Sequence, residues 1–180
     1  MTGQLIAVVG PSGVGKDSLI DGLATRDTTL RPVRRVITRP GDAGGEDFES
    51  VDEETFAERV SDGDFCLHWE AHGLRYGIPS EALVAVSAGE WQLANLSRGS
   101  IEAAAHVFPA LTVLSVTAAP HILAVRLSGR GRETPEEIAR RLARPGVAPP
   151  RGVRHAEIDN SGTLDMAVTA ALAAIYGPAA

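Results

Sequence analysis

The sequence is poor in cysteine and in long apolar runs. Cys66 is the only cysteine, so an internal disulfide cannot form and we expect a reducing compartment. No apolar run approaches the roughly 20 residues that a membrane-spanning helix needs. Residues 5–9 begin a strand pattern with no basic leader before them. We therefore expect a cytoplasmic protein that has no membrane partner.

Positive charge is also scarce. The formal net charge is −6, which argues against a nucleic-acid partner because such proteins usually carry a basic surface. The five histidines show no metal-ligand spacing, and there is no second cysteine, so a zinc site is not expected. The 180 residues, of which 44% are apolar and 22% charged, fit a single domain over residues 1–180.

Lysine is rarer still. Of 17 basic side chains, 16 are arginine, and the one lysine is Lys16. Lysine ends in a compact ammonium group, whereas arginine ends in a planar guanidinium group. Phosphate-binding loops use the ammonium group of lysine. The alternative is a solvated surface lysine that stands at this position by chance.

Lys16 closes a glycine-rich motif of the form Gly-x4-Gly-Lys. Glycines let successive backbone N–H groups curve around a phosphate, and a following helix directs its positive N-terminal end at the same anion. A strand pattern before the motif and helical spacing after it are the context that a phosphate loop needs. We predict that ATP binds through Gly10, Pro11, Ser12, Gly13, Val14, Gly15, Lys16, Asp17 and Ser18.

Asp17 stands where a phosphate loop usually has a serine or threonine that helps to hold Mg²⁺. A carboxylate is a suitable ligand for a hard cation, so Asp17 is our candidate metal residue, binding Mg²⁺ directly or through water. The alternative is that this carboxylate only complements the helix dipole. The sequence leaves both interpretations open.

Strand and helix patterns alternate along the chain. Apolar runs predict strands at residues 5–9, 33–38, 65–69, 74–78, 90–96, 111–117 and 154–158. The strands at 65–69 and 74–78 are expected to pair across a turn at His72-Gly73. Helical spacing predicts helices at residues 16–24, 52–61, 80–88, 100–107, 122–127 and 164–175, and a capping box marks residues 134–137. This alternation is typical of an α/β protein whose parallel sheet has helices on both faces.

Arginines cluster in the C-terminal half of the chain. Arg126 and Arg130 lie beside two glycines, and further arginines follow on a predicted helix. Several guanidinium groups on a glycine-rich segment suit a lid, over residues 126–145, that neutralises a transferred phosphate. We single out Arg130 and Arg141 as catalytic. The alternative is a solvated helix face on which Glu137 and Arg141 form an ordinary surface pair.

Together these motifs resemble guanylate kinase. Within that superfamily, the sequence is more similar to the ribose 1,5-bisphosphate phosphokinases of phosphonate catabolism. The resemblance extends from about residue 3 to residue 172. It rests on Gly15-Lys16-Asp17-Ser18-Leu19, Ile37-Thr38-Arg39, Trp69-x-Ala71-x-Gly73-Leu74-x-Tyr76-Gly77, Ser97-Arg98 and Arg130-Gly131-Arg132-Glu133.

The resemblance implies a P-loop fold like that of nucleoside monophosphate kinases, with an acceptor-binding insertion at about residues 33–80 and the arginine lid. It implies that the γ-phosphoryl group of ATP, with Mg²⁺ as cofactor, passes to the 1-phosphate of ribose 1,5-bisphosphate. The products are 5-phospho-α-D-ribose 1-diphosphate and ADP. The roles implied are catalytic for Lys16, Arg130 and Arg141, acceptor-binding for Arg39, Tyr76, Arg35 and Arg98, and packing against adenine for Asp159 and Asn160.

Three departures separate the sequence from guanylate kinase. His68, Ile78 and Asn95 stand where that family has a glutamate, a serine and an aspartate. A site without the matching hydrogen-bonding groups rejects guanine. A guanylate kinase or another nucleoside monophosphate kinase is nevertheless the alternative. A non-catalytic interaction module is a third hypothesis, which the intact Gly15-Lys16 disfavours. Monomer and homodimer both stay open.

Two further pairs of residues have simpler expected roles. Trp69 and Trp91 are expected in the core. Glu46 and Asp47 follow a glycine-rich stretch, so we expect them in a solvated loop. The alternative for this acidic pair is contact with Mg²⁺ or a ribose hydroxyl.

Overall fold

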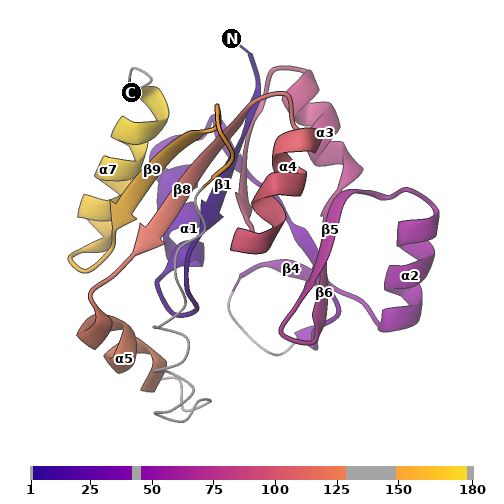
Figure 1. Cartoon of the computed structure of the whole chain (residues 1–180), viewed down its shortest axis with the longest axis horizontal. Helices are drawn as coiled ribbons and strands as arrows, with labels where there is room; N and C mark the ends of the chain where they lie inside the picture. Colours follow the sequence, from indigo (N-terminus) through magenta and orange to yellow (C-terminus); the bar gives the residue numbers. More distant parts are fainter. Residues whose placement is uncertain (1, 42–45, 129–148, 178–180) are drawn as a thin grey trace.

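The computed structural model describes residues 2–41, 46–128 and 149–177 (Figure 1). Its larger sheet has five parallel strands in the order β2-β7-β1-β8-β9. Their bounds are β1 (Gln4–Val9), β2 (Leu30–Pro32), β7 (Trp91–Asn95), β8 (Leu111–Thr117) and β9 (Arg154–Asp159). Parallel neighbours need long crossover connections, which here contain the helices.

β1 lies in the middle of this sheet and is buried on both faces. Ile6 and Val8 belong to one core, and Leu5, Ala7 and Val9 belong to the other. None of these five side chains is more than 2% exposed. A strand buried on both faces reads as a continuous apolar run, because neither face contributes polar residues. The sheet must therefore be covered by helices on both sides.

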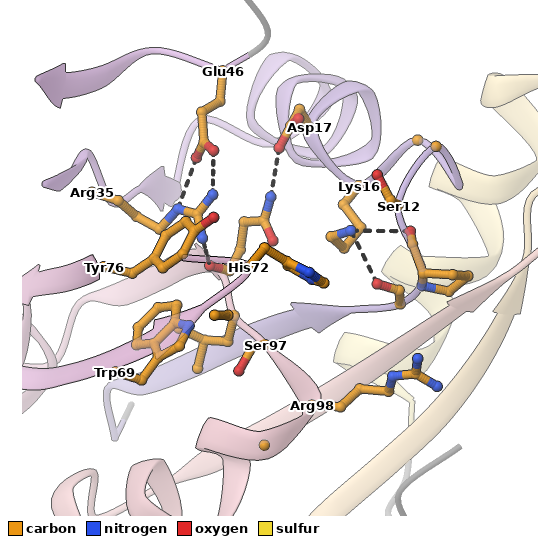
Figure 2. Close-up of a pocket in the computed structure, with 18 of the residues that line it drawn as sticks. Ser12, Lys16, Asp17, Arg35, Glu46, Trp69, His72, Tyr76, Ser97 and Arg98 are labelled. Carbon is orange, nitrogen blue, oxygen red and sulfur yellow. Dashed lines mark hydrogen bonds and ion pairs between the residues drawn. The ribbon is translucent and has the colours of Figure 1, made fainter. Parts of the chain in front are cut away.

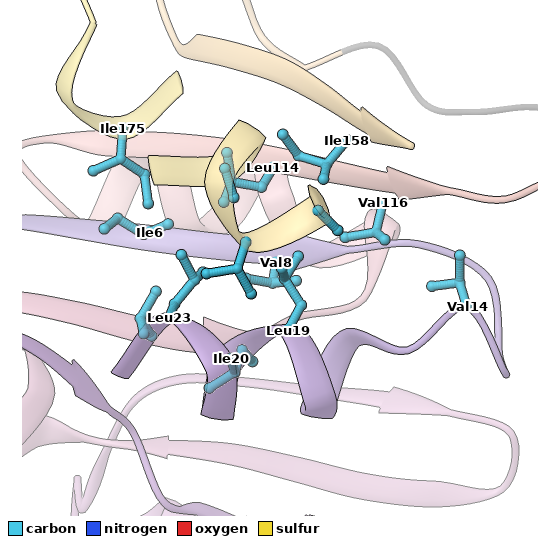
Figure 3. Packing of buried hydrophobic residues seen from close by; sticks show 14 of the residues in the cluster. Ile6, Val8, Val14, Leu19, Ile20, Leu23, Leu114, Val116, Ile158 and Ile175 are labelled. Carbon is cyan, nitrogen blue, oxygen red and sulfur yellow. The ribbon is translucent and has the colours of Figure 1, made fainter. Parts of the chain in front are cut away.

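Helices do cover both faces. Leu19 and Leu23 of α1 and Ile175 of α7 pack on the core that contains Ile6 and Val8 (Figure 3). The helices α3 and α4 contribute to the core on the opposite face. The expected α/β fold, with a parallel sheet between two helical layers, is confirmed. The bounds are α1 (Lys16–Arg26), α3 (Ser80–Ser87), α4 (Ile101–Val107), α5 (Pro120–Ser128) and α7 (Leu164–Tyr176), with a 3₁₀ turn η2 (Arg98–Ser100).

A smaller four-stranded sheet has the order β4-β3-β6-β5. Phe56 of α2 stacks on Phe65 with ring centroids 4.9 Å apart, and both pack with Val36 in a small core of their own. The side chain of Asp52 caps α2 by accepting a hydrogen bond from the backbone N–H of Thr55. The bounds are β3 (Arg35–Ile37), β4 (Phe48–Ser50), α2 (Glu53–Ser61), β5 (Phe65–Ala71) and β6 (Leu74–Pro79).

β5 and β6 form an antiparallel hairpin. Its two turn residues, His72 and Gly73, have φ angles of 56° and 72°. Positive φ at both positions is a feature of the type I′ turn, whose twist matches that of the flanking strands. The hairpin predicted across these two residues is confirmed.

The boundaries predicted for the strand at residues 33–38 are wrong. Leu30–Pro32 pairs with β7 in the large sheet, whereas Arg35–Ile37 pairs with β4 and β6 in the small one. The chain passes from one sheet to the other between these two strands. Each has three residues, which is too short for a periodic signal. β4 is equally short and is not among the expected strands.

Two other expectations concern helices. The capping box at residues 134–137 lies outside the described residues. Within the described ranges, no helix combines the length and the apolar character that crossing a bilayer requires.

Gly22 lets α1 and α7 approach closely, which gives a first prediction. A Cβ at Gly22 would lie 2.7 Å from Cγ2 of Val168, a stiff β-branched side chain that is buried. Overpacking costs about 1–3 kcal/mol, whereas alanine improves helix propensity by only about 1 kcal/mol. Gly22→Ala should therefore lower the free energy of unfolding measured in urea.

The matched control is Val168→Ala, which removes the opposing methyl groups. The double variant should be more stable than the sum of the two single changes by more than about 0.5 kcal/mol, because the two positions share the same space. Strictly additive effects would contradict this account of the helix contact.

Candidate active site

The phosphate loop begins at the carboxyl end of β1 and leads into α1 (Figure 2). Gly13 and Gly15 have φ angles of 81° and 95°, a conformation that costs other residues roughly 1–2 kcal/mol. A Cβ at Gly15 would also lie 2.6 Å from Nδ2 of Asn160. Both the backbone conformation and the available space therefore require glycine at position 15.

Lys16 is the first residue of α1, and its side chain turns back over the loop. Its Nζ donates hydrogen bonds to the carbonyl oxygens of Gly10, at 3.1 Å, and Pro11, at 3.2 Å (Figure 2). The ammonium group and the N-terminal end of α1 together make this region positive, which favours a bound anion.

Asn160 and Arg126 support the loop from the side of β9 and α5. Asn160 is 4% exposed, and its Nδ2 donates to the carbonyl oxygen of Val14 at 2.8 Å. Arg126 donates to the same oxygen at 3.3 Å and to that of Asn160 at 2.9 Å. Asn160 thus acts on the shape of the loop. Its neighbour Asp159 is exposed, and hydrogen bonds from the side chain and backbone of Ser161 lower the pKa of Asp159.

A cavity of about 1040 Å³ extends from the phosphate loop to the small sheet. The loop and the start of α1 line one part of it. Arg39, Trp69 and Tyr76 of the small-sheet region line another part, and residues 95–99, from the end of β7 onward, line a third. Figure 2 shows Trp69, Tyr76, Ser97 and Arg98 around this space. Segments from three places in the sequence therefore share one site.

Most of the predicted site residues line this cavity. They are Gly10, Pro11, Ser12, Gly13, Gly15, Lys16, Asp17, Ser18, Arg35, Arg39, Tyr76 and Arg98. Val14 is buried in the core next to the loop, and Asp159 and Asn160 are not among the residues that line the cavity. Arg130 and Arg141 lie outside the described residues.

Arg35 and Glu46 form an ion pair at the edge of the cavity, with side chains only 7% and 14% exposed. Nε of Arg35 donates to Oε2 of Glu46 at 2.9 Å, and Nη1 donates to the carbonyl oxygen of Asn95 at 2.8 Å. The expectation of a solvated loop is therefore wrong for Glu46, because its carboxylate balances the charge of a buried arginine. Asp47, in contrast, is exposed, with its side chain 84% accessible.

Tyr76 is held between two flat groups. Its ring stacks on Trp69, with centroids 5.3 Å apart and planes inclined by 7°, and Cζ of Arg35 lies 5.1 Å from the centroid of the Tyr76 ring. Trp69 and Tyr76 face each other across the hairpin. The prediction of Trp69 as core is incomplete, because this half-buried side chain packs on a core and also lines the cavity.

Asp17 and Asn95 meet at the point where α1 begins and β7 ends. Nδ2 of Asn95 donates to Oδ1 of Asp17 at 2.7 Å (Figure 2). In the described parts of the chain, no group of three or more His, Cys, Asp or Glu side chains is arranged to hold a metal. Mg²⁺ typically uses one or two carboxylates and completes its shell with water and substrate phosphates. The carboxylate of Asp17, which lines the cavity beside the phosphate loop, fits that pattern.

Sequence reasoning missed several residues of the cavity. His72 and Ser97 line it. Ser97 stands in the Ser97-Arg98 motif of the resemblance, but neither residue was assigned a role. Arg39, which was predicted, places its guanidinium over the ring of Phe48 at 4.2 Å. Pairing of Trp69 with Tyr76 in the predicted hairpin is the one signal from which the position of Trp69 could have been found.

Comparison with known proteins identifies relatives along the whole chain. No family model matches it. A ribose 1,5-bisphosphate phosphokinase PhnN from a Ruegeria species is 53% identical over 174 residues, which is 96% of this chain and 92% of the relative. A protein of the same name from Rhizobium etli is 45% identical and covers 97% and 90%. A bifunctional ribose 1,5-bisphosphokinase-thymidine phosphorylase from Cupriavidus pinatubonensis is 45% identical over 93% of this chain but only 28% of its own length.

Solved structures agree on the fold. Guanylate kinase from Anaplasma phagocytophilum superposes with a TM-score of 0.65 at 21% identity, covering 97% of this chain and 85% of that one. A gluconokinase from Sinorhizobium meliloti has a TM-score of 0.56 at 20% identity, covering 96% and 91%. At such identities the likeness concerns the fold alone. The fold of P-loop kinases, the intact phosphate loop and 53% identity over nearly the full length together show that this chain belongs to the ribose 1,5-bisphosphate phosphokinase family.

Proposed function

We propose that the protein transfers the γ-phosphoryl group of ATP to the 1-phosphate of ribose 1,5-bisphosphate, giving 5-phospho-α-D-ribose 1-diphosphate and ADP. The observation that carries this proposal is the single cavity that joins the phosphate loop to a wall containing Arg39, Tyr76 and Arg98. The names of the relatives support the choice of acceptor.

The proposed chemistry needs charge neutralisation more than proton transfer. The acceptor is a phosphate monoester, whose second pKa is about 6, so its oxygen is largely ionised near neutral pH. Two polyanions must approach each other, and their repulsion is the main obstacle. Catalysis therefore rests on alignment and on cations placed around the transferred group.

On this proposal the residues of the loop bind the donor. Backbone N–H groups of the segment 10–18, in which only Pro11 lacks one, contact the phosphates of ATP. Lys16 stabilises charge on the β- and γ-phosphates. Asp17 would hold Mg²⁺, which when bound supplies further neutralisation of the phosphate charge. Asn160 contributes to ATP binding by holding the loop in shape, because its side-chain amide donates a hydrogen bond to the carbonyl oxygen of Val14.

The small-sheet region, about residues 33–80, binds the acceptor on this proposal. Arg39 and Tyr76 contact one phosphate, and Arg98 contacts the other. Arg35 acts through Tyr76 and Asn95, which it contacts directly. The chain is then one kinase domain, in which a lid at about residues 126–145 adds the catalytic arginines Arg130 and Arg141.

The acceptor is tested with a panel of phosphorylated compounds. With ATP and Mg²⁺, ribose 1,5-bisphosphate should release ADP at least about 100-fold faster than GMP or AMP, because unmatched polar groups in a site penalise the wrong substrate strongly. ADP release is followed by a coupled assay, and the diphosphate product is identified by mass spectrometry. Rapid turnover of GMP would overturn the assignment.

Lys16 gives a second test. Lys16→Met keeps the length of the side chain but removes the ammonium, so kcat should fall by about 10²–10³-fold. Lys16→Arg restores the charge in a planar form and should recover only a small part of the rate. Normal turnover in either variant would contradict the proposed role.

The lone lysine also allows a binding measurement on the unaltered protein. An amine-selective reagent can modify only Lys16 and the terminal amino group. ATP should slow the modification of Lys16, quantified by peptide mass spectrometry, and leave that of the terminus unchanged. Equal modification of Lys16 with and without ATP would show that the nucleotide does not cover this side chain.

A further inference from the structure

Asp17 and Asn95 occupy two positions that the fold brings together. Asp17 follows the lysine of the phosphate loop, and Asn95 ends β7, which pairs in parallel with β1. Asn95 is 8% exposed, and its amide nitrogen lies 2.7 Å from Oδ1 of Asp17. The two side chains are thus a hydrogen-bonded pair at the edge of the cavity, beside Lys16.

The chemistry of the pair assigns each side chain a direction. A carboxylate only accepts hydrogen bonds, so the amide of Asn95 must present its NH₂ group to Asp17 and turn its oxygen away. An amide nitrogen that donates a hydrogen bond cannot coordinate a cation. Among the described residues this is the one hydrogen bond recorded for the Asp17 carboxylate, and it occupies Oδ1.

Asn95 is itself fixed from the other side. Its backbone oxygen accepts a hydrogen bond from Nη1 of Arg35 at 2.8 Å, and Arg35 pairs with Glu46. The opposite charges of Arg35 and Glu46 offset each other. Within this cluster of four side chains, the charge that is not offset is therefore the carboxylate of Asp17. Asp21, one helical turn further along α1, also lines the cavity.

P-loop enzymes in general hold Mg²⁺ with a hydroxyl group after the loop lysine and an aspartate from another strand. Here the carboxylate follows the lysine, and a neutral amide ends the strand. We propose that the two positions have exchanged roles: Asp17 supplies the carboxylate for the metal of MgATP, and Asn95 is the positioning residue that fixes its orientation. This inference deepens the proposed function and rests on its nucleotide half alone.

If Asp17 and Asn95 have exchanged roles, their substitution should change the gain in ATP affinity that Mg²⁺ provides, which a purely structural role would leave unchanged. Asp17→Ser should remove most of the gain in ATP affinity that Mg²⁺ provides. Adding Asn95→Asp to that variant returns a carboxylate to the strand position and a hydroxyl to the loop position, so the gain should reappear. Asn95→Leu, which keeps Asp17 but removes its hydrogen-bond donor, should weaken the Mg²⁺-dependent part by about 10-fold or more.

The readout is the dissociation constant of ATP, measured by titration calorimetry with Mg²⁺ and again with a chelator, with no acceptor present. The matched control is Asp165→Asn. Asp165 is also the second residue of its helix, and among the described residues its one ion pair is an exposed one with Arg26. This control loses the same charge at the same helical position and should keep the full Mg²⁺ effect.

Each outcome decides the question. Recovery in the double variant, to within about threefold of the unaltered protein, supports the exchange; a double variant no better than Asp17→Ser overturns it. An unchanged Mg²⁺ effect in Asp17→Ser also overturns it and leaves Asp17 with a helix-dipole role. If Asp17→Ser does not fold, as judged by thermal unfolding, the isosteric Asp17→Asn replaces it in both backgrounds. Failure of the acceptor panel leaves this experiment intact, because no acceptor is used.

Discussion

The position of β1, the middle strand of the large sheet, is fixed because its side chains are buried in two cores, one on each face of the sheet. Its neighbours β7 and β8 run parallel to it, so the ends of three strands meet at one edge of the sheet. Ligands of open α/β sheets bind outside that edge. Asp17 and Asn95, separated by 78 positions in the sequence, come within hydrogen-bonding distance there as a consequence of strand order alone.

The small sheet has its own core around Phe56 and Phe65. It also packs on the large sheet, because Leu67 of β5 and Ile78 of β6 belong to the core that covers one face of β1. Arg35 belongs to the small sheet, yet it donates to the backbone of Asn95 in the large one. Its buried pairing with Glu46 adds little net stability, because the cost of removing two charges from water offsets their attraction. Its hydrogen bond to the carbonyl oxygen of Asn95 instead links the two sheets beside the site.

The parts of this molecule that could be predicted from the sequence are those with local signals. Residues 5–9 predict a buried strand because they form a continuous apolar run. The glycines that follow predict a phosphate loop because backbone positions with positive φ favour glycine. The three-residue strands are too short to show a comparable sequence pattern. Glu46 looks like a loop residue because its partner is 11 positions away and is reached only through tertiary packing. Family resemblance supplied the roles of Arg39 and Tyr76, which no local pattern defines.

The stacked arrangement around Tyr76 has a thermodynamic consequence for ligand binding. The ring lies between the indole of Trp69 and the guanidinium of Arg35 before any ligand arrives. Ordering a side chain at a binding site costs about 0.5–1.5 kcal/mol when that side chain is otherwise free to rotate. Folding has already restricted this one, so the entropy is lost once, when the hairpin packs, and not again with each molecule that enters the cavity.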